Sequence, residues 1–346
     1  MHPARQLTTI VAAFVLAGAR VFAAASNDTF TVAAYNVENW NSIERHGQSN
    51  QPKPASEKTS VWKILAQVRP DVLGIEEMGQ TNDLAELQAG LRERGLDLPH
   101  VEWIQSADSN RHVALLSRFP ITQRFSRTDY TYTLDGRTHR VQRGFLDVRI
   151  QVNDHFTFRA LVAHLKSKRQ SSEGDQAKMR LEEARLLRGH IGKALKDEPQ
   201  LRLIAMGDLN DTFDSEAIRT VIGEPPFALL DLMPVDSRGG HDTHFWKARD
   251  QFSRIDYLIS SPAMHAALVP DSARIADFDG WNDASDHRAV FARFRLGGAG
   301  SSGAAAFSDR RVWLIGLNLV AIVAVSVAVA YFARRHHHPQ ANVARQ

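Results

Sequence analysis

Apolar residues are distributed along this chain in two patterns, short continuous runs and longer segments with helical periodicity. Short runs rich in Val, Ile, Leu and Phe predict strands, and they span residues 30–34, 71–75, 112–116, 146–152, 156–163, 201–206, 255–259 and 289–294. Three longer segments, residues 56–69, 84–94 and 175–196, carry apolar side chains at helical spacing and predict helices. Residues 107–111 and 170–175 are polar and read as exposed loops.

The order of these elements predicts the fold class. Strands outnumber helices, and several strands follow one another with no helix between them. A doubly wound α/β fold requires regular alternation of strands and helices, so this order argues against it. We expect an α/β fold built from two mixed sheets, with the helices packed on their outer faces.

The N-terminus has the pattern of a secretory signal peptide. Arg5 precedes an apolar stretch over residues 7–18, and the small-residue run at residues 23–25 is typical of a signal-peptidase site. The apolar stretch is short for a bilayer span. We therefore interpret residues 1–25 as a signal peptide, in preference to an uncleaved anchor or a core helix.

The C-terminal part of the sequence predicts a membrane anchor. Residues 312–333 carry no charge, and as a helix they would extend roughly 33 Å, enough to cross a bilayer core. A glycine- and serine-rich linker, residues 297–311, separates them from the rest, which disfavours a buried core helix. With the signal peptide, this pattern predicts a domain over residues 26–296 on the periplasmic or extracellular face and a cytoplasmic tail over residues 334–346.

Charge and cysteine content narrow the possible chemistry. The formal net charge is +3, but the two ends carry seven arginines and one aspartate, so the domain between them has about −3. This charge gives no global attraction for nucleic acid, and any polyanion needs a local basic patch or bound cations. The chain has no cysteine, which excludes a thiol nucleophile or thiolate ligand and leaves stability to the core.

Polar residues follow several predicted strands at the point where each strand ends. Gly207 allows a sharp turn after residues 201–206, so Asp208 and Asn210 emerge together, where they could hold a water beside a phosphate. Asn36 and Glu38 share one side of an extended chain, where one could approach a cation and the other support it. In isolation either string is compatible with an ordinary polar turn.

Two further strings combine a buried strand with charged groups. Glu76 and Glu77 end one strand, and because adjacent side chains point to opposite faces, only one is expected to serve a given site. His164 directly follows the predicted strand over residues 156–163 and could donate a hydrogen bond to a phosphoryl oxygen. Lys166 and the basic residues that follow it could bind further phosphates, although such a run is often only a solvated face.

The last two strings predict a buried acid–imidazole pair. Asp256 lies among apolar residues at a strand, and a buried carboxylate needs a partner. Asp286 and His287 precede the last strand and could supply that partner. An Asp256–His287 contact would orient the imidazole and raise its pKa. Each residue taken singly is also compatible with a structural salt bridge or a cap.

The ordered set of strings resembles the endonuclease/exonuclease/phosphatase family, which includes type I deoxyribonuclease, abasic-site endonucleases, inositol polyphosphate 5-phosphatases and neutral sphingomyelinases. The resemblance covers residues 29–295, nearly the whole predicted domain. It implies a four-layer α/β sandwich of two mixed β-sheets flanked by helices, with the active site at one end of the two packed sheets.

The resemblance also implies a role for each matching position. The implied catalytic residues are His164, Asp208, Asn210, Asp256 and His287; the implied metal-site residues are Asn36, Glu77 and Asp286; and the implied phosphate contacts are Arg143 and Lys166. Glu76 stands where the family commonly has Gln, which leaves it as the alternative to Glu77. Abasic-site endonucleases generally have Tyr where this chain has His164, which disfavours that branch.

The implied reaction is in-line attack by water on a phosphorus ester, assisted by Mg²⁺, with Mn²⁺ or Ca²⁺ as alternatives. We therefore expect an exported phosphodiesterase that acts on nucleic acid or phospholipid and is held to the membrane by its C-terminal helix. The alternative hypothesis is a catalytically silent binding or scaffold domain of the same fold on a membrane anchor.

Overall fold

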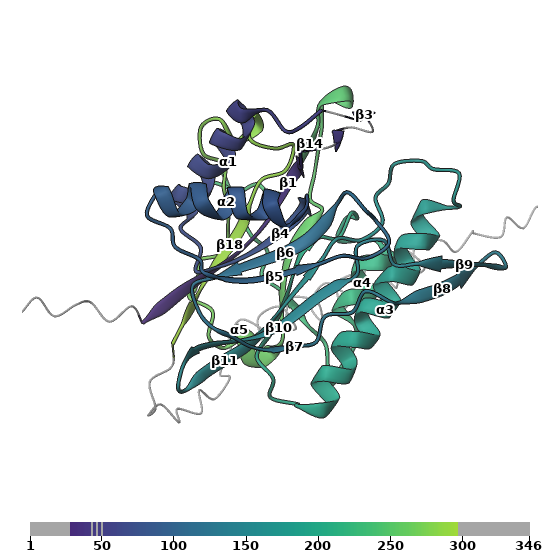
Figure 1. Cartoon of the computed structure of the whole chain (residues 1–346). Coiled ribbons are helices and arrows are strands. Elements are labelled where there is room, and N and C mark those ends of the chain that lie inside the picture. Colours follow the sequence, from purple (N-terminus) through teal and green to yellow (C-terminus); the bar gives the residue numbers. More distant parts are fainter. Residues whose placement is uncertain (1–27, 43, 46–47, 50, 297–346) are drawn as a thin grey trace, which may run out of the picture. The chain divides into compact units, whose positions relative to one another are not determined.

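The computed structural model describes residues 28–42, 44–45, 48–49 and 51–296. Two six-stranded mixed sheets dominate these residues (Figure 1). The first sheet has the order β17 (Arg274–Ile275), β18 (Val290–Arg295), β1 (Thr29–Trp40), β4 (Val72–Met78), β6 (His112–Ser117) and β5 (His100–Ile104). The second has the order β13 (Leu230–Asp231), β16 (Asp256–Ser260), β12 (Leu203–Asp208), β11 (Phe156–Ala163), β10 (Phe145–Asn153) and β7 (Ile121–Arg124).

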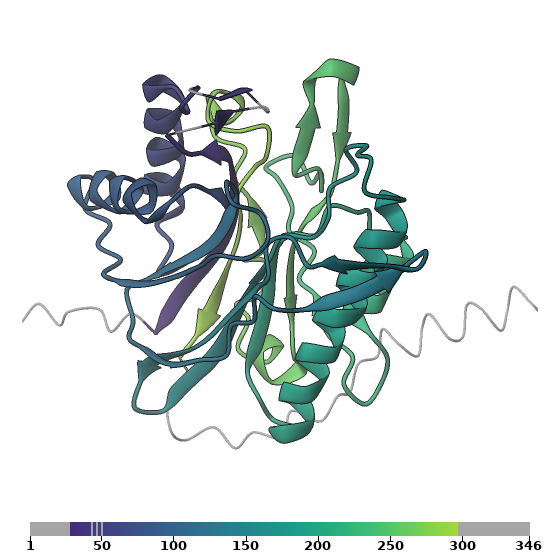
Figure 2. The ribbon, with the colours of Figure 1, turned by 45° about the vertical axis from the view of Figure 1, so that its right-hand side comes forward.

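Helices cover the outer face of each sheet. The first sheet is covered by α1 (Ala55–Val68) and α2 (Thr81–Glu93), and the second by α3 (Gln176–Asp197) and α4 (Glu216–Ile222). Figure 2 shows the four layers from left to right. The remaining elements are short: α5 (Pro262–His265), the pairs β2 (Glu44–Arg45) with β3 (Gln48–Ser49), β8 (Thr131–Leu134) with β9 (Arg137–Arg140) and β14 (His244–Trp246) with β15 (Gln251–Ser253), and the 3₁₀ turns Lys247–Arg249 and Trp281–Asp283.

Strand β1 shows why the sheets are apolar on both faces. Alternate side chains point to opposite faces of a strand, so Phe30 and Val32 face the second sheet while Ala33 and Tyr35 face α1 and α2. A middle strand buried on both sides must be apolar at every position, which explains the continuous runs in the sequence. The structure accordingly has one core between the sheets and one under each helical layer.

The pairing of the strands brings the polar strings to one end of the sandwich. β1 runs parallel to β4, and β11 runs parallel to β12, so the residues that follow these strands emerge at shared edges. β16 runs antiparallel to β12 and pairs Asp256, its first residue, with Asp208, the last residue of β12. β18 likewise runs antiparallel to β1, so Asp286 and His287 reach this edge from the opposite chain direction.

The structure confirms the predicted strands and helices and adds elements that the sequence analysis missed. Each predicted strand and each of the three predicted helices is present within a few residues of its expected bounds. The missed elements are the edge strands β5, β7, β13 and β17, the short hairpins, the helices α4 and α5, and the two 3₁₀ turns. Edge strands and hairpins are largely exposed here and therefore lack the apolar runs that mark buried strands.

The predicted signal peptide, linker, transmembrane helix and cytoplasmic tail all lie outside the described residues. Among the residues that the structure describes, no helix combines the length and apolar character needed to cross a membrane. The export signal and the anchor therefore stay predictions from the sequence.

Phe30 provides a test of the core between the sheets. Its ring contacts those of Phe119, Phe156, Phe158 and Phe294 at centroid distances of 5.3–6.0 Å. We expect Phe30→Ala to lower the free energy of unfolding by about 3–5 kcal/mol, because the cavity would lie between both sheets. Urea unfolding followed by tryptophan fluorescence measures this change.

The matched control for that variant is Phe213→Ala. The Phe213 side chain is exposed, so its removal should change the free energy of unfolding by no more than about 0.5 kcal/mol. Equal effects of the two substitutions would contradict the described packing of β1 against the second sheet.

Candidate active site

Asp208 lies at the centre of the polar residues that gather at this end of the sandwich. It ends β12, and the preceding Gly207 has a φ of 124°, which residues with a side chain rarely adopt. A Cβ at position 207 would lie 2.4 Å from the carbonyl oxygen of Ala163 in β11 and 2.5 Å from Oε1 of Glu76 in β4. Glycine is therefore required here, because backbone and side chain from both sheets approach this position.

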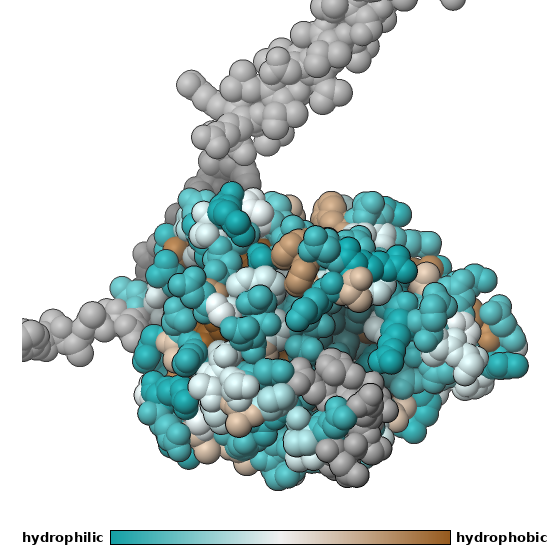
Figure 3. All heavy atoms as spheres, turned by 90° about the horizontal axis from the view of Figure 1, so that it is seen from above, coloured by the Kyte–Doolittle hydropathy of each residue, from teal (hydrophilic) through white to brown (hydrophobic). Residues whose placement is uncertain are grey.

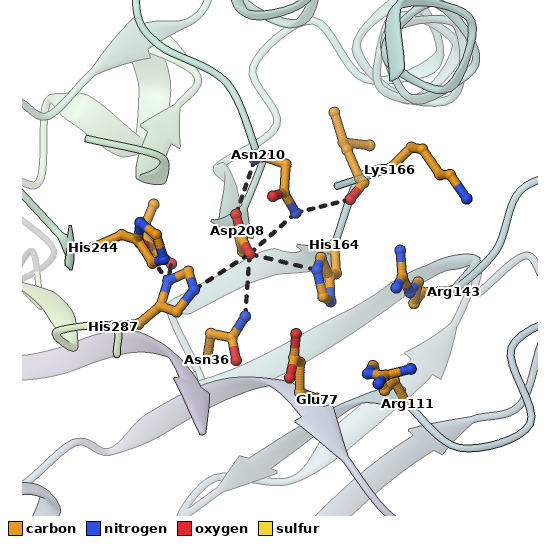
Figure 4. A network of polar contacts seen from close by, with 12 residues as sticks. Asn36, Glu77, Arg111, Arg143, His164, Lys166, Asp208, Asn210, His244 and His287 are labelled. Carbon is orange, nitrogen blue, oxygen red and sulfur yellow. Dashed lines mark hydrogen bonds and ion pairs between the residues drawn. The ribbon is translucent and has the colours of Figure 1, made fainter. Parts of the chain in front are cut away.

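Polar groups from both sheets surround the Asp208 carboxylate (Figure 4). Oδ2 accepts hydrogen bonds from the side-chain amides of Asn36 and Asn210, each at 3.1 Å, and Oδ1 accepts one from the backbone N–H of Asn210 at 2.9 Å. Nε2 of His164 lies 3.4 Å from Oδ2, and Nε2 of His287 lies 3.8 Å from it. The predicted catalytic residues thus meet around one carboxylate.

A chain of polar contacts holds the His287 ring. Its Nδ1 lies 2.9 and 3.1 Å from the two carboxylate oxygens of Asp256. The Thr243 hydroxyl donates to Oδ2 of Asp256 at 2.6 Å and accepts from the backbone N–H groups of Ile255 and Asp256 at 3.1 and 3.0 Å. These contacts fix the ring orientation and leave Nε2 facing Asp208. The acid–imidazole pair predicted from the sequence is therefore present.

Burial and neighbouring charges shift the pKa values of these groups. Burial raises the pKa of Asp208 to about 7, and Asp256 adds to this rise while His287 opposes it. Burial lowers the pKa of His287, but the Asp256 and Asp208 carboxylates outweigh that effect and raise it well above its usual value. Burial, together with the charges of Arg143 and His287, holds the pKa of His164 well below its usual value. At neutral pH the site contains a charged His287 and a neutral His164.

The two glutamates at the end of β4 have different surroundings. Glu76 is fully buried, and neither of its carboxylate oxygens has a hydrogen-bond partner among the described residues. Burial, with Asp256 and Asp208 nearby, raises the pKa of Glu76 well above its usual value. Glu77 has a φ of 58° and lines the cavity, and its Oε2 accepts the Asn39 backbone N–H at 3.0 Å. This irregular backbone keeps both carboxylates near the site, whereas a regular strand would separate them.

Carboxylates at this end offer oxygen atoms of the kind that bind hard divalent cations. Glu77 and Asp286 line the same cavity as Asp208, and the backbone N–H of Asp286 donates to Oε2 of Glu38 at 3.1 Å. Oxygen donors of this kind suit Mg²⁺ or Ca²⁺. The unpartnered Glu76 carboxyl adds to the excess of acidic groups that a cation would offset. Glu77 and Asp286 both line the cavity, and their assignment as metal ligands stays a prediction.

Asn36 makes different contacts from those expected of a metal ligand. Its Nδ2 donates to Asp208, and its Oδ1 accepts the backbone N–H of Glu38 at 3.0 Å. The side chain therefore orients Asp208 and the turn that carries Glu38. Its assignment to the metal stays a prediction, and these contacts favour a positioning role.

A cavity of about 780 Å³ opens over these groups. Seen from above, the surface around it is mostly hydrophilic and hollowed near the middle (Figure 3). One part of its lining is basic and consists of Arg111, Arg143, Lys166, Lys168 and Arg169. Arg143 is buried beside Asp108, with 3.3 Å between Nε and Oδ2, and its Nε and Nη1 have no hydrogen-bond partner among the described residues. Such a wall beside the Asp208 cluster suits a phosphate group.

Three residues of the site were not predicted from the sequence: Thr243, His244 and Arg111. Thr243 and His244 come from a hairpin region without any strong pattern, and only their tertiary position reveals them. Arg111 lies in a segment predicted to be an exposed loop, yet it lines the cavity and donates to Oδ1 of Asn39 at 2.7 Å. An arginine directly before a buried strand was the available signal for Arg111.

Thr243→Val tests the support of the acid–imidazole pair. The valine would leave a buried carboxylate oxygen and two backbone N–H groups without the hydroxyl they contact. We expect the free energy of unfolding to fall by about 1–3 kcal/mol in urea. Thr133→Val, at an exposed position of β8, is the matched control and should change it by no more than about 0.5 kcal/mol. Unchanged stability of Thr243→Val would contradict the described network.

Several solved structures share this architecture. Sphingomyelinase C from Streptomyces griseocarneus aligns at a TM-score of 0.53 and 16% identity, covering 77% of this chain and 99% of its own. Truncated TDP2 from Caenorhabditis elegans aligns at 0.53 and 15%, covering 77% and 97%. The human Nocturnin catalytic domain with bound sulfate anion aligns at 0.53 and 15%, covering 77% and 94%. At these identities the likeness establishes the fold.

The sequence comparisons identify the family. No match was found among curated protein sequences. The family model described as "Endonuclease/Exonuclease/phosphatase family" matches residues 41–287, which include Glu77, His164, Asp208 and His287. This match covers most of the chain, and the chain is a member of the endonuclease/exonuclease/phosphatase family.

Proposed function

We propose that this protein is an exported, membrane-tethered, divalent-metal-dependent phosphodiesterase that cleaves phosphodiester bonds of nucleic acid or phospholipid by in-line attack of water. One observation carries the proposal: Asp208, Asn210, His164 and the His287–Asp256 pair converge on one point of a cavity with a basic wall. A hydrolase needs a base, hydrogen-bond donors and a place for an anion in this arrangement.

Asp208 acts as the general base in the proposed mechanism. Asn210 and Asp208 hold the attacking water, and Asp208 accepts its proton. A pKa near neutrality suits this task, because a base is most efficient when its pKa lies near the working pH. Asn36 keeps the carboxylate in place through its 3.1 Å hydrogen bond.

The two histidines stabilise charge on the phosphoryl oxygens. His287 is charged and held by Asp256, so its Nε2 can donate to an oxygen as negative charge develops. His164 is neutral and lies on the other side of Asp208, and Arg143 presents buried N–H groups beyond it. The divalent cation, held by Glu38, Glu77 and Asp286, would supply Lewis-acid stabilisation of the phosphate and leaving oxygen.

The cellular placement rests on the sequence. Residues 1–25 have the pattern of a signal peptide and residues 312–333 that of an anchor, which would hold the domain outside the cytoplasm. Mg²⁺ is the proposed ion, since the Glu38, Glu77 and Asp286 donors are oxygens. Protease treatment of intact cells should remove the domain if it is exported, and protection until lysis would contradict this placement.

A substrate panel separates the two proposed classes. The domain carries about −3 charges, which disfavours tight non-specific binding of DNA. A membrane tether suits a phospholipid, and one structural neighbour is a sphingomyelinase C. Plasmid DNA, RNA, sphingomyelin and phosphoinositides, each assayed with Mg²⁺, identify the class by the substrate with the highest kcat/KM.

Metal removal tests the proposed enzyme against the alternative of a silent scaffold. We expect the full chain to release p-nitrophenol from bis-p-nitrophenyl phosphate with Mg²⁺ and to lose this activity in EDTA, because without the cation the carboxylates of the site repel the phosphate. Activity should return when excess Mg²⁺ is added. Absence of metal-dependent release by folded protein would favour the scaffold.

Asp208→Asn tests the proposed base. The amide keeps the size of the side chain but cannot accept the proton, so kcat should fall about a hundred- to ten-thousand-fold. Asp214→Asn, an exposed change nearby, is the matched control and should leave kcat within about twofold, as surface substitutions usually do. If Asp208→Asn retained full activity while folded, Asp208 would not be the base.

A further inference from the structure

Glu183 is a buried carboxylate that the proposed mechanism leaves unused. It lies on the face of α3 that packs against the second sheet, and it has no exposed surface. Taking a carboxylate out of water costs free energy unless hydrogen-bond donors or positive charges offset the loss. The groups that surround Glu183 therefore show what this residue holds in place.

The Glu183 carboxylate joins two segments of the basic wall of the cavity. Its Oε2 accepts the backbone N–H of Lys166 at 2.7 Å, and its Oε1 accepts the backbone N–H of Gln142 at 3.3 Å. Gln142 directly precedes Arg143, and both Arg143 and Lys166 line the cavity on the same side of Asp208 (Figure 4). One side chain thus bridges the segments that carry these two cations.

The pairing of β10 with β11 ends before it reaches these segments. The register of the two strands ends at Phe145 and Ala163, and Arg143 and Lys166 lie beyond that pair. In a continued antiparallel ladder the two backbones would bond to each other. Here the Glu183 carboxylate accepts a backbone N–H from each segment, so the separation of the segments depends on this side chain.

Arg180, on the preceding turn of α3, holds the Lys166 segment through its carbonyl group. Side chains three residues apart lie on one face of a helix, so Arg180 and Glu183 reach the same segment. Nη1 of Arg180 donates to the backbone carbonyl of Lys166 at 3.1 Å. Its Nε and Nη2 lie 2.9 and 2.8 Å from Oδ2 of Asp211. One face of α3 therefore fixes both backbone groups of Lys166.

Glu183 also helps to offset the buried charge of Arg143. Burial raises the pKa of Glu183, and the positive charge of Arg143 is foremost among the influences that oppose this rise. Nε and Nη1 of Arg143 have no hydrogen-bond partner among the described residues. Glu183 thus stabilises the guanidinium by charge while these two nitrogens stay available to an anion.

We propose that Glu183 is a positioning residue that sets the spacing of Arg143 and Lys166, and through them the affinity of the cavity for the phosphate group of the substrate. The inference rests on the proposed function, which identifies the anion as a phosphate ester. Glu183 is fully buried and acts through the two segments. The wall contacts the phosphate in the ground state and in the transition state alike, so loss of its spacing raises KM more than it lowers kcat.

Glu183→Gln in the full chain tests the proposal. The amide keeps the shape but has one acceptor oxygen, so one of the two backbone N–H groups loses its partner. We expect KM for bis-p-nitrophenyl phosphate to rise at least about tenfold and kcat to stay within about threefold. The dissociation constant of inorganic phosphate, measured by calorimetry with Mg²⁺, should rise by a similar factor. Glu182→Gln, at a neighbouring side chain that pairs with Arg185, is the matched control and should change each value by no more than about twofold.

Phosphate binding separates this inference from the proposed hydrolysis. If the unmodified protein binds phosphate but hydrolyses nothing, the hydrolase is refuted, and weaker phosphate binding by Glu183→Gln still supports the positioning role. If the protein hydrolyses the ester and Glu183→Gln leaves KM and phosphate affinity unchanged, the inference is overturned and the hydrolase stands. A lower Tm with unchanged phosphate affinity would show a purely structural role, and absence of phosphate binding by the unmodified protein would also overturn the inference.

Two further measurements cover a variant that does not fold. Far-UV circular dichroism establishes folding, and if Glu183→Gln fails, Glu183→Asp decides by the same criteria, because its shorter side chain cannot reach both N–H groups. Hydrogen exchange of the unmodified protein needs no variant. The amide hydrogens of Gln142 and Lys166 should be protected, and exchange as fast as in an unstructured peptide would overturn the inference.

Discussion

Crowding of acidic groups between two apolar sheets is the constraint on which this structure depends. Asp208, Asp256 and Glu76 are buried together; Asp256 and Asp208 add to the rise in the pKa of Glu76 caused by burial, and Asp256 adds to that of Asp208. The His287 imidazole, whose pKa these carboxylates raise despite its burial, is placed against them. Hydrogen bonds from Asn36, Asn210 and Thr243 stabilise particular oxygens. The three acidic groups still outnumber the imidazole that offsets them. This excess of acidic groups explains why this end of the sandwich is suited to cations and to proton transfer.

The strand pairing determines which groups share this environment. Two parallel strands place the residues at their C-terminal ends at the same edge of the sheet. An antiparallel neighbour places its N-terminal residues, or those just before it, at that edge. Asp208 and Asp256 are therefore direct partners although they are far apart in sequence. The same rule explains why β1 and the segment before β18 both contribute, since the Ser285 hydroxyl donates to the backbone carbonyl of Asn36 in β1 at 2.8 Å. The paired strands thus fix the relative positions of the segments that carry the site residues.

Most of the sandwich and its central residues could be predicted from the sequence, because apolar runs end abruptly at polar strings such as the one containing Asp208. Other features depended on tertiary pairing. Nothing local indicates that Thr243 will contact Asp256 or that His244 will face His287, since both come from a hairpin whose position is set by distant strands. The alternation rule also failed at Glu77, whose left-handed backbone conformation departs from a regular strand.

Gly207 has a wider consequence for the molecule. Facing β-sheets usually lie about 10 Å apart, a spacing filled by side chains from both. At position 207 the second sheet contributes no side chain, and the space is taken by the Glu76 carboxyl from the first. The Glu76 carboxyl of one sheet thus lies against the backbone of the other, and nearby Asn36 of the first sheet donates directly to Asp208 of the second. A larger residue at position 207 would push Glu76 and the neighbouring backbone away. The contacts between the two sheets, including that of Asn36 with Asp208, would then lose their alignment.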